Sequence, residues 1–379
     1  MTDSPILHLK DHGQSVWMDN LSRDLLVSGE LASLMAQRDV HGITSNPAIF
    51  EKAIAGNKIY DEDIEKGIRA GKSIEEIYES LVFEDIRTAC DMLMPVYESS
   101  DRHDGYVSLE VPPDLARNAE KTLEEARRYF DTVSRPNLMI KIPGTPEGLV
   151  AVEQAIREGI NVNVTLLFSV QSYIDTAWAY IRGLEGRLAD GNDISHIASV
   201  ASFFLSRIDS KVDAQIEQLM NSTSDFQLRL RLARAKGKVA IANAKLAYQH
   251  YKEIITTERW QKLAAKGAQV QRLLWASTST KNPNYSDVMY VNELIGPDTV
   301  NTLPPVTLEA CADHCDVASR IESDLLRTRN LINELDDLGI NLDHVMDELL
   351  AEGIEKFVQP FNKLMDSLVI KVKHLKPVS

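Results

Sequence analysis

The feature that most constrains the fold of this 379-residue chain is an alternation of short apolar segments with long amphipathic ones. The predicted strands are residues 15–21, 41–46, 105–111, 137–143, 160–168, 197–204, 271–278 and 299–304. Helical periodicity fills the intervals: in EGLVAVEQAIREG, Leu149, Val152 and Ile156 share one face, and Gly159 is a stop signal. Strands that alternate with helices indicate a parallel α/β fold.

Eight strands favour a closed (β/α)8 TIM barrel over an open doubly wound sheet, and no Gly-x-Gly-x-x-Gly sequence follows an early strand. We therefore predict a single barrel domain over residues 1–379. Long helical insertions are expected at residues 47–104 and 205–270, and the second contains the amphipathic segment LRLRLARAKGKVAIANAKLAYQHYKEII. Residues 307–379 are expected to form a C-terminal helical segment that packs on the barrel and has no further role.

Charge and composition exclude several classes of partner. The chain has 41 basic and 56 acidic residues, and its net charge of −15 opposes binding to nucleic acid or to an anionic membrane. The segment MTDSPILHLKDHG has no signal-peptide pattern, and no apolar run approaches the length of a membrane span. We expect a cytoplasmic protein, and the sequence is compatible with either a monomer or a homodimer.

The three cysteines do not form a disulfide framework in a chain of this length. The segment CADHC, from Cys311 to Cys315, contains three metal-binding residue types, but nothing nearby completes a four-ligand site. We predict that Cys90, Cys311 and Cys315 are thiols packed in helices, and a redox role for the last two stays open.

A lysine interrupts one of the most apolar predicted strands. In RPNLMIKIPGT, residues 135–145, Lys141 follows Leu138, Met139 and Ile140. A strand that is apolar on both faces is typical of a parallel sheet covered on both sides. An unpaired ammonium there would cost several kcal/mol, so Lys141 needs either a partner or a catalytic purpose.

Polar side chains lie at corresponding levels of the other predicted strands. In INVNVTLLF, Asn161, Asn163 and Thr165 alternate with apolar residues, so they share one face, which is expected to point into the barrel. The same alternation groups Tyr106 with Ser108 and Glu110, Thr44 with Asn46, Trp17 with Asp19, Trp275 with Ser277, and Ser202 with Phe204. These sets lie toward the carboxyl ends of their strands, where barrels of this type build active sites.

These residue types suit one kind of chemistry. Lysine forms a Schiff base with a carbonyl carbon, and burial with cationic neighbours lowers the pKa of a lysine. Carboxylates such as Asp19 and Glu110 would then move protons, because breaking a carbon–carbon bond beside an iminium requires a hydroxyl to lose and regain a proton. The histidines are scattered along the chain, so we predict no metal site.

Each of these residues also has a purely structural interpretation. Asn46 precedes Pro47 and could cap a helix or form a turn. The serines, Asn163 and Thr165 could satisfy backbone groups at strand ends, and the two carboxylates could be buried ion-pair partners of the lysine. The coincidence of these groups at one level of different strands favours the catalytic interpretation.

Three segments resemble the transaldolase family in its longer bacterial type: DVHGITSNPAIFEKAI, NLMIKIPGTPEGLVAVEQAIREGINVNVTLLFSVQSY and VASFFLSRID. The similarity in order and spacing runs from about Val16 to Leu303. It implies a class I aldolase-type barrel without cofactor. Its sugar-phosphate reaction would move a dihydroxyacetone unit from sedoheptulose 7-phosphate to glyceraldehyde 3-phosphate, giving erythrose 4-phosphate and fructose 6-phosphate in the non-oxidative pentose phosphate pathway.

The resemblance implies roles for individual residues. Lys141 matches the Schiff-base lysine and Asp19 the proton-transferring aspartate. Glu110 and Thr165 match the pair that holds the catalytic water. The substrate-binding residues that it implies are Thr44, Asn46, Asn163, Ser202, Phe204, Arg207 and Ser277, with Arg207 as a phosphate-binding arginine.

The segment WASTSTKNP departs from the shorter transaldolases, because Ser279 stands where they carry a second phosphate arginine. Lys281 could supply the missing charge as a point charge without the arginine fork. Related aldolases that cleave fructose 6-phosphate would have glutamine at Glu110 and tyrosine at Phe204. An aldolase that releases free dihydroxyacetone, a non-catalytic sugar-phosphate binder and one half of a fused pathway enzyme remain alternatives.

Overall fold

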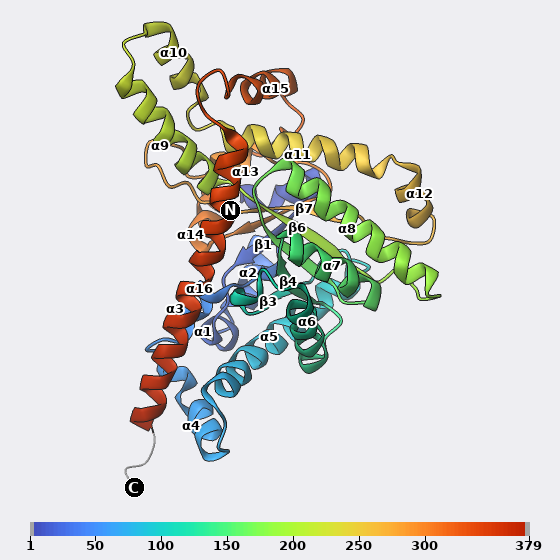
Figure 1. The fold of residues 1–379 in the computed structure, drawn as a ribbon. Coiled ribbons are helices and arrows are strands. Elements are labelled where there is room, and N and C mark those ends of the chain that lie inside the picture. The colour runs from blue at the N-terminus through green and yellow to red at the C-terminus, as the bar shows by residue number, and fades with distance from the viewer. Residues whose placement is uncertain (1–3, 376–379) are drawn as a thin grey trace.

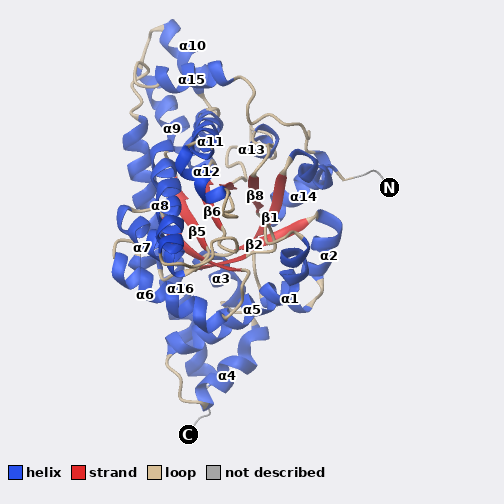
Figure 2. Cartoon of the chain, turned by 90° about the vertical axis from the view of Figure 1, so that its right-hand side faces the viewer, coloured by secondary structure: helices blue, strands red, loops and turns tan. Residues whose placement is uncertain are grey.

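The computed structural model describes residues 4–375, which form a closed barrel of eight parallel strands in chain order (Figures 1 and 2). The strands are β1 Gln14–Asp19, β2 Val40–Thr44, β3 Val107–Glu110, β4 Leu138–Pro143, β5 Val162–Leu167, β6 Ser199–Phe204, β7 Arg272–Ala276 and β8 Thr299–Leu303. Strand β8 pairs with β1 and closes the barrel. The predicted fold class and all eight predicted strands are confirmed, with ends that differ by a few residues.

Helices surround the strands on the outside of the barrel (Figure 2). Those that precede the last C-terminal helices and lie outside the two insertions are η1 Pro5–His12, α1 Arg23–Val27, α2 Glu30–Arg38, η3 Pro113–Leu115, α6 Ala119–Val133, α7 Pro146–Glu158, α8 Val170–Ala189, α13 Met289–Glu293 and α14 Pro305–His314. Helix α7 ends at Gly159, which adopts a left-handed φ of 96°, as its stop signal predicts.

Both predicted insertions are helical. The first contains α3 Pro47–Ile54, η2 Lys58–Tyr60, α4 Asp61–Arg69 and α5 Ile74–Ser99, and the second contains α9 Ser206–Ser222, α10 Phe226–Ala235, α11 Val239–Ile255 and α12 Glu258–Ala264. The amphipathic segment predicted in the second insertion is not one continuous helix. It breaks between α10 and α11 where Gly237 has a φ of 67°, and a Cβ there would lie 2.6 Å from the ring of Tyr285.

The amino-terminal end of the barrel is filled by side chains that satisfy one another. Trp17 lies over Gly42 of β2, where a Cβ would be only 2.4 Å from the indole ring. The indole Nε1 donates a 2.6 Å hydrogen bond to Asp104, which also accepts one from Ser15. Arg272 of β7 pairs with the same carboxylate at 3.4 Å. This layer closes the lower end of the barrel.

The C-terminal segment contains α15 Leu325–Glu334 and α16 Leu342–Leu375. Helix α16 is drawn in red in Figure 1 and contacts α3, α5, α9 and β5. Gly353 permits this approach, because a Cβ there would lie 3.0 Å from the side chain of Leu166. The predicted helical packing is confirmed, and the arrangement is compatible with the single domain predicted for residues 1–379.

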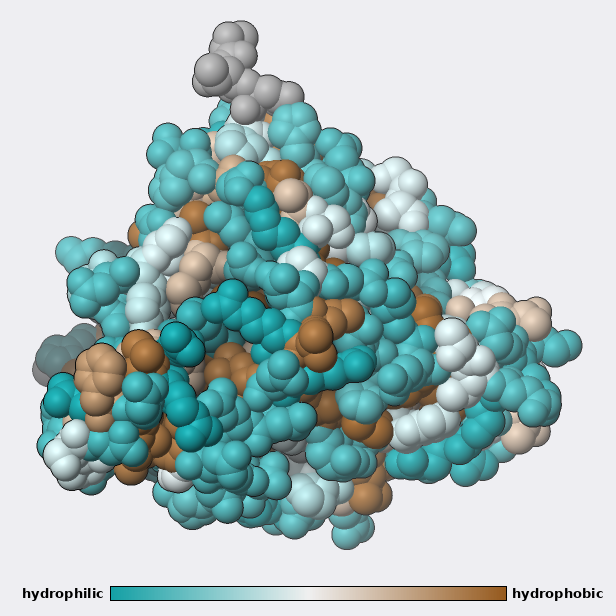
Figure 3. Space-filling view, turned by 90° about the horizontal axis from the view of Figure 1, so that it is seen from above, coloured by the Kyte–Doolittle hydropathy of each residue, from teal (hydrophilic) through white to brown (hydrophobic). Residues whose placement is uncertain are grey.

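The three cysteines are buried free thiols. Cys90 lies in α5 and Cys311 in α14, as predicted, whereas Cys315 follows α14 as its non-helical C-cap residue. Among residues 4–375 we find no helix that combines the length and the apolar character of a membrane span. Figure 3 shows a largely hydrophilic face on which apolar residues form separated patches. Scattered apolar surface of this kind is ordinary in globular proteins.

Candidate active site

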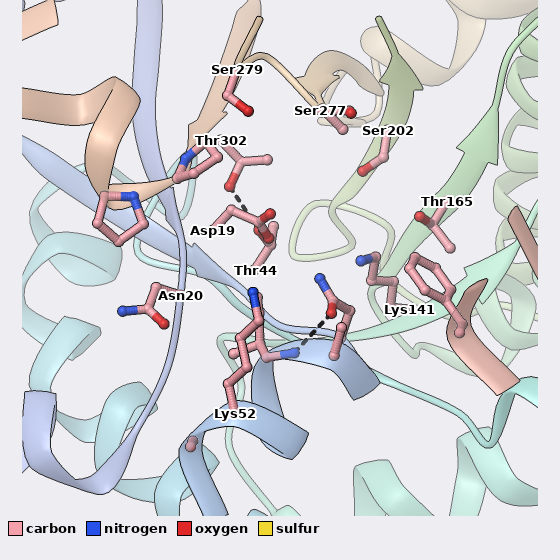
Figure 4. Close-up of a pocket in the computed structure, with 18 of the residues that line it drawn as sticks. Asp19, Asn20, Thr44, Lys52, Lys141, Thr165, Ser202, Ser277, Ser279 and Thr302 are labelled. Atoms are coloured by element: carbon pink, nitrogen blue, oxygen red, sulfur yellow. Dashed lines mark hydrogen bonds between the residues drawn. The ribbon is translucent and has the colours of Figure 1, made fainter. Parts of the chain in front are cut away.

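A cavity of about 680 Å³ opens at the carboxyl ends of the strands. The residues predicted for the site that line it are Asp19, Thr44, Asn46, Lys141, Thr165, Ser202, Phe204, Arg207, Ser277 and Lys281. Figure 4 shows Lys141 and Thr165 on one side of the cavity and Asp19 on the other. The structure therefore brings together side chains from strands that lie far apart in the sequence.

Lys141 points into the barrel from β4 and is 5% exposed. Its Nζ donates a 3.1 Å hydrogen bond to the carbonyl oxygen of Ser45 and lies 3.5 Å from Oε2 of Glu110. The strand register places Glu110 of β3 directly beside Lys141, which explains this pairing. One carbonyl and one distant carboxylate leave the other donor positions of the amine facing the cavity.

Glu110 lies just beneath the cavity wall. Burial raises the pKa of this carboxyl group to about 7, although the ammonium group of Lys141 opposes the shift. Within the described residues, neither carboxylate oxygen has a hydrogen-bond partner, and the same is true of Oγ1 of Thr165. Buried polar atoms without partners cost free energy, so these oxygens form a place suited to a water molecule or a substrate hydroxyl.

Asp19, the last residue of β1, is half-buried at the opposite wall. It accepts a 2.7 Å hydrogen bond from Oγ1 of Thr44, which also lies 2.7 Å from Oγ1 of Thr302 (Figure 4). Burial raises the pKa of Asp19, outweighing the lowering by Lys141 and by the hydrogen bond from Thr44. A carboxyl group with a raised pKa that faces an amine across the cavity is suited to proton transfer.

The alternating pattern of the strands does not reveal the contacts of Asn163 and Asn46. Asn163 is fully buried; it donates to Oγ of Ser108 at 3.0 Å and accepts from Oγ of Ser202 at 2.7 Å, so it orients a residue of the cavity wall from beneath. Asn46 caps α3 by accepting a 3.1 Å hydrogen bond from the amide of Ile49, and it also lines the cavity. Capping and lining the cavity are therefore compatible at this position.

Arg207 lies in the first turn of α9, directly after β6. Its Cζ is 5.2 Å from the ring centroid of Phe204, and its Nη1 is buried without a hydrogen-bond partner in the part of the chain that the structure describes. Asp209, two residues further along α9, forms no salt bridge with Arg207 among the described residues. Asp209 instead accepts 2.8 Å hydrogen bonds from the amide of Ala240 and the hydroxyl of Tyr290.

The end of β7 corrects one sequence prediction. Alternation groups Trp275 with Ser277 on the inner face, but Trp275 packs edge-on against Phe203 on the outer face and donates to the carbonyl oxygen of Leu294. Ser277 reaches the cavity because it adopts a left-handed φ of 56°, which interrupts the alternation. A period-two pattern cannot reveal such a change of backbone conformation.

Lys281 lies at the rim of the cavity, where its Nζ donates a 2.8 Å hydrogen bond to Oγ of Ser279. Partial burial and the positive charge of Arg207 lower the pKa of Lys281, and Lys52 contributes in the same direction. Lys52 rises from α3 beside the cavity (Figure 4). Three cations thus line one cavity, although the sequence indicates only Arg207 and Lys281.

Two groups of residues line the cavity without having been predicted from the sequence. Asn20 follows Asp19 in the sequence, and Thr302 contacts Thr44. Lys52 lies one helical turn after Ala48 and Ile49, on the face of α3 that lines the cavity. Phe357 comes from α16, so the expectation that the C-terminal segment only packs is wrong. No local pattern identifies Phe357, because it reaches the cavity through helix packing distant in sequence.

Comparisons with known proteins agree with this geometry. The profile of the family described as "Transaldolase/Fructose-6-phosphate aldolase" matches residues 16–368. The "Transaldolase 2" of Nostoc punctiforme is 65% identical over 381 residues, and the "Transaldolase" of Trichodesmium erythraeum is 62% identical over 380, each with full coverage of both chains. The "Transaldolase" of Thermobifida fusca is 46% identical over 368 residues, covering 96% of this chain and 97% of the relative. This chain therefore belongs to the transaldolase/fructose-6-phosphate aldolase family.

Proposed function

We propose that this enzyme transfers a dihydroxyacetone unit from sedoheptulose 7-phosphate to glyceraldehyde 3-phosphate, forming erythrose 4-phosphate and fructose 6-phosphate, in the cytoplasmic non-oxidative pentose phosphate pathway. The observation that carries the proposal is the buried amine of Lys141, which faces a cavity flanked by two carboxyl groups of raised pKa. Full-length similarity to proteins named transaldolase supports the same reaction. One chain forms the cavity, which is compatible with a monomer or a homodimer.

The proposed reaction begins when Nζ of Lys141 attacks the keto carbon of the donor sugar. Loss of water gives an iminium, which withdraws electrons from the neighbouring carbon–carbon bond. Asp19 accepts the proton of the adjacent hydroxyl as that bond breaks and the aldose leaves. The remaining enamine attacks the acceptor aldehyde, and Asp19 returns the proton to the new hydroxyl.

Water must leave when the iminium forms and must return when the product is released. The unpartnered oxygens of Glu110 and Thr165 lie beside the amine-bearing strand, and they support a role in holding this water. Since the pKa of Glu110 is about 7, this group can exchange a proton with the water near neutral pH. Gln at this position would retain hydrogen bonding but not the proton exchange.

The two ends of the substrate require different partners. The hydroxyls and amide of Thr44, Asn46 and Ser202 are suited to the dihydroxyacetone unit. A phosphate needs local cations because the chain has a net charge of −15, and Arg207 with Lys281 can supply them at the cavity.

Reductive trapping tests the proposal. We expect borohydride and fructose 6-phosphate to leave a dihydroxyacetone adduct on Lys141, detected by peptide mass spectrometry, because borohydride reduces the iminium to a stable amine. Lys141→Arg should lose both the adduct and turnover, since a guanidinium cannot act as a neutral amine. Lys245→Arg is a matched control, because Lys245 is 3% exposed but pairs with Glu293. An adduct on another lysine would contradict the proposal.

A further inference from the structure

One ring from the C-terminal helix lies beside both key cations of the site. Phe357 is 4% exposed, and its ring centroid is 5.6 Å from Nζ of Lys141 and 5.8 Å from Cζ of Arg207. The same guanidinium lies 5.2 Å from the ring centroid of Phe204. These separations are within the range of cation–π attraction. Phe357 therefore connects the amine of β4 with the arginine of α9.

Contacts on both sides define the position of this ring. Lys211 of α9 pairs with Glu348 at 3.0 Å and with Glu352 at 2.5 Å, so α16 is held against the helix that also carries Arg207. One turn before Phe357, Gly353 brings α16 close to the end of β5. The helix is thus attached both to α9 and to the end of β5 within the turns that precede the ring.

An apolar ring at this position affects the proposed intermediate. After the aldose leaves, the enamine on the lysine has two fates. Addition to an aldehyde completes the transfer. Alternatively, protonation at carbon regenerates an iminium, water adds across its C=N bond, the C–N bond breaks, and free dihydroxyacetone leaves as the amine is restored. A ring that keeps water away from the enamine and the iminium favours transfer to the aldehyde over release.

The ring also acts on the arginine. A guanidinium that packs on aromatic faces is restricted in its rotation, so less conformational freedom is lost when it binds two phosphate oxygens. Nη1 of Arg207 is buried without a protein acceptor among residues 4–375, which leaves it available for such a ligand.

We propose that Phe357 is a positioning residue of the transfer reaction, which holds Arg207 for the substrate phosphate and keeps water from the iminium formed on Lys141. This inference rests on the proposed function and extends it to the C-terminal helix. Through Phe357, α16 sets the balance between transfer to an aldehyde and release of dihydroxyacetone.

The test compares two rates in Phe357→Leu. The first is the transfer from fructose 6-phosphate to erythrose 4-phosphate, and the second is the release of dihydroxyacetone from fructose 6-phosphate without acceptor. We expect the ratio of transfer to release to fall about tenfold, because the smaller leucine side chain admits water to the intermediate. The KM for fructose 6-phosphate should rise more than the KM for fructose. Phe357→Tyr keeps the ring and should stay closer to the wild-type ratio.

Phe361→Leu is the matched control, because Phe361 lies one turn further along α16 and packs on Tyr78 with 5.5 Å between ring centroids. It should lower the melting temperature as much as Phe357→Leu while leaving the ratio unchanged. A wild-type ratio in Phe357→Leu, or an equal change in Phe361→Leu, would overturn the inference. Failure to trap an adduct in the wild-type enzyme would instead overturn the proposed function, so the two failures are distinguishable.

Discussion

The two ends of the barrel bury carboxylates in opposite ways. At the amino end, burial raises the pKa of Asp104, but Arg272 and hydrogen bonds from neighbouring groups outweigh it and leave the pKa below its usual value. At the carboxyl end, burial prevails at Glu110 and raises its pKa to about 7. The comparison teaches that the partners, rather than the depth of burial, decide whether a buried acid stabilises the fold or remains available for chemistry.

The same strands serve both ends. On β1, Trp17 satisfies Asp104 below, whereas Asp19 two residues later faces the cavity. On β7, Arg272 closes the lower layer, and the chain then turns at Ser277 toward the substrate side. If the comparison is right, substitutions at the upper end should reduce activity and those at the lower end should reduce stability.

Asp19→Asn should show the largest effect. We expect kcat to fall about 10²-fold or more, because the amide cannot accept and return the substrate proton. The melting temperature should stay at or above that of the wild type, since a carboxyl group with a raised pKa is replaced by a neutral group. Steady-state transfer kinetics and thermal unfolding would check both, and an unchanged kcat would make Asp19 a structural residue.

Asp104→Asn should reduce the stability of the fold rather than kcat. We expect a loss of about 2–4 kcal/mol in the free energy of unfolding at pH 7, because the substitution removes the buried partner of Arg272. Since the folded-state pKa of Asp104 is lowered, its contribution is complete above the unfolded-state value and is lost as the pH falls through the folded-state pKa. In urea unfolding, the difference in free energy of unfolding between the wild type and Asp104→Asn should be smaller at pH 3 than at pH 7.

Glu110→Gln is the control, because the stability difference at this position should depend on pH in the opposite direction. The folded-state pKa of Glu110 is raised, so its ionisation destabilises the fold as the pH rises from about 4.3 to about 7. The stability of the wild type relative to Glu110→Gln should therefore be higher at pH 5 than at pH 8. If the stability of the wild type relative to each variant changed with pH in the same direction, the proposed contrast between the two ends of the barrel would be wrong.

Arg207→Ala should have a smaller effect. We expect the KM for fructose 6-phosphate to rise about tenfold, because a charge-assisted hydrogen bond to phosphate is lost. The KM for fructose should change little, since fructose carries no phosphate. Equal losses for the two sugars would place the phosphate elsewhere.

The sequence predicts the barrel and the identity of most wall residues because both depend on local alternation. In INVNVTLLF the period-two pattern determines the face on which each side chain lies. It does not determine how deep a side chain lies along the barrel axis, so it cannot distinguish Thr165 at the cavity from the buried Asn163 beneath it. The same pattern is wrong about Trp275, which faces outward, and it does not reveal that Ser277 reaches the cavity through a left-handed backbone conformation. Phe357 was missed because its position depends on packing between distant elements.

Lys281→Ala should have the smallest effect and tests how this chain compensates for Ser279 in place of a second arginine. We expect the KM for fructose 6-phosphate to rise about two- to fourfold, and the change to shrink at high salt, because an ammonium at the rim acts as a screened point charge. The hydrogen bond to Ser279 holds the ammonium toward the cavity. Lys52→Ala is the comparison, because Lys52 also lines the cavity and its positive charge acts on Lys281. If only Lys52→Ala raises the KM, the second phosphate cation comes from α3, and the rim of β7 contributes hydroxyl groups alone.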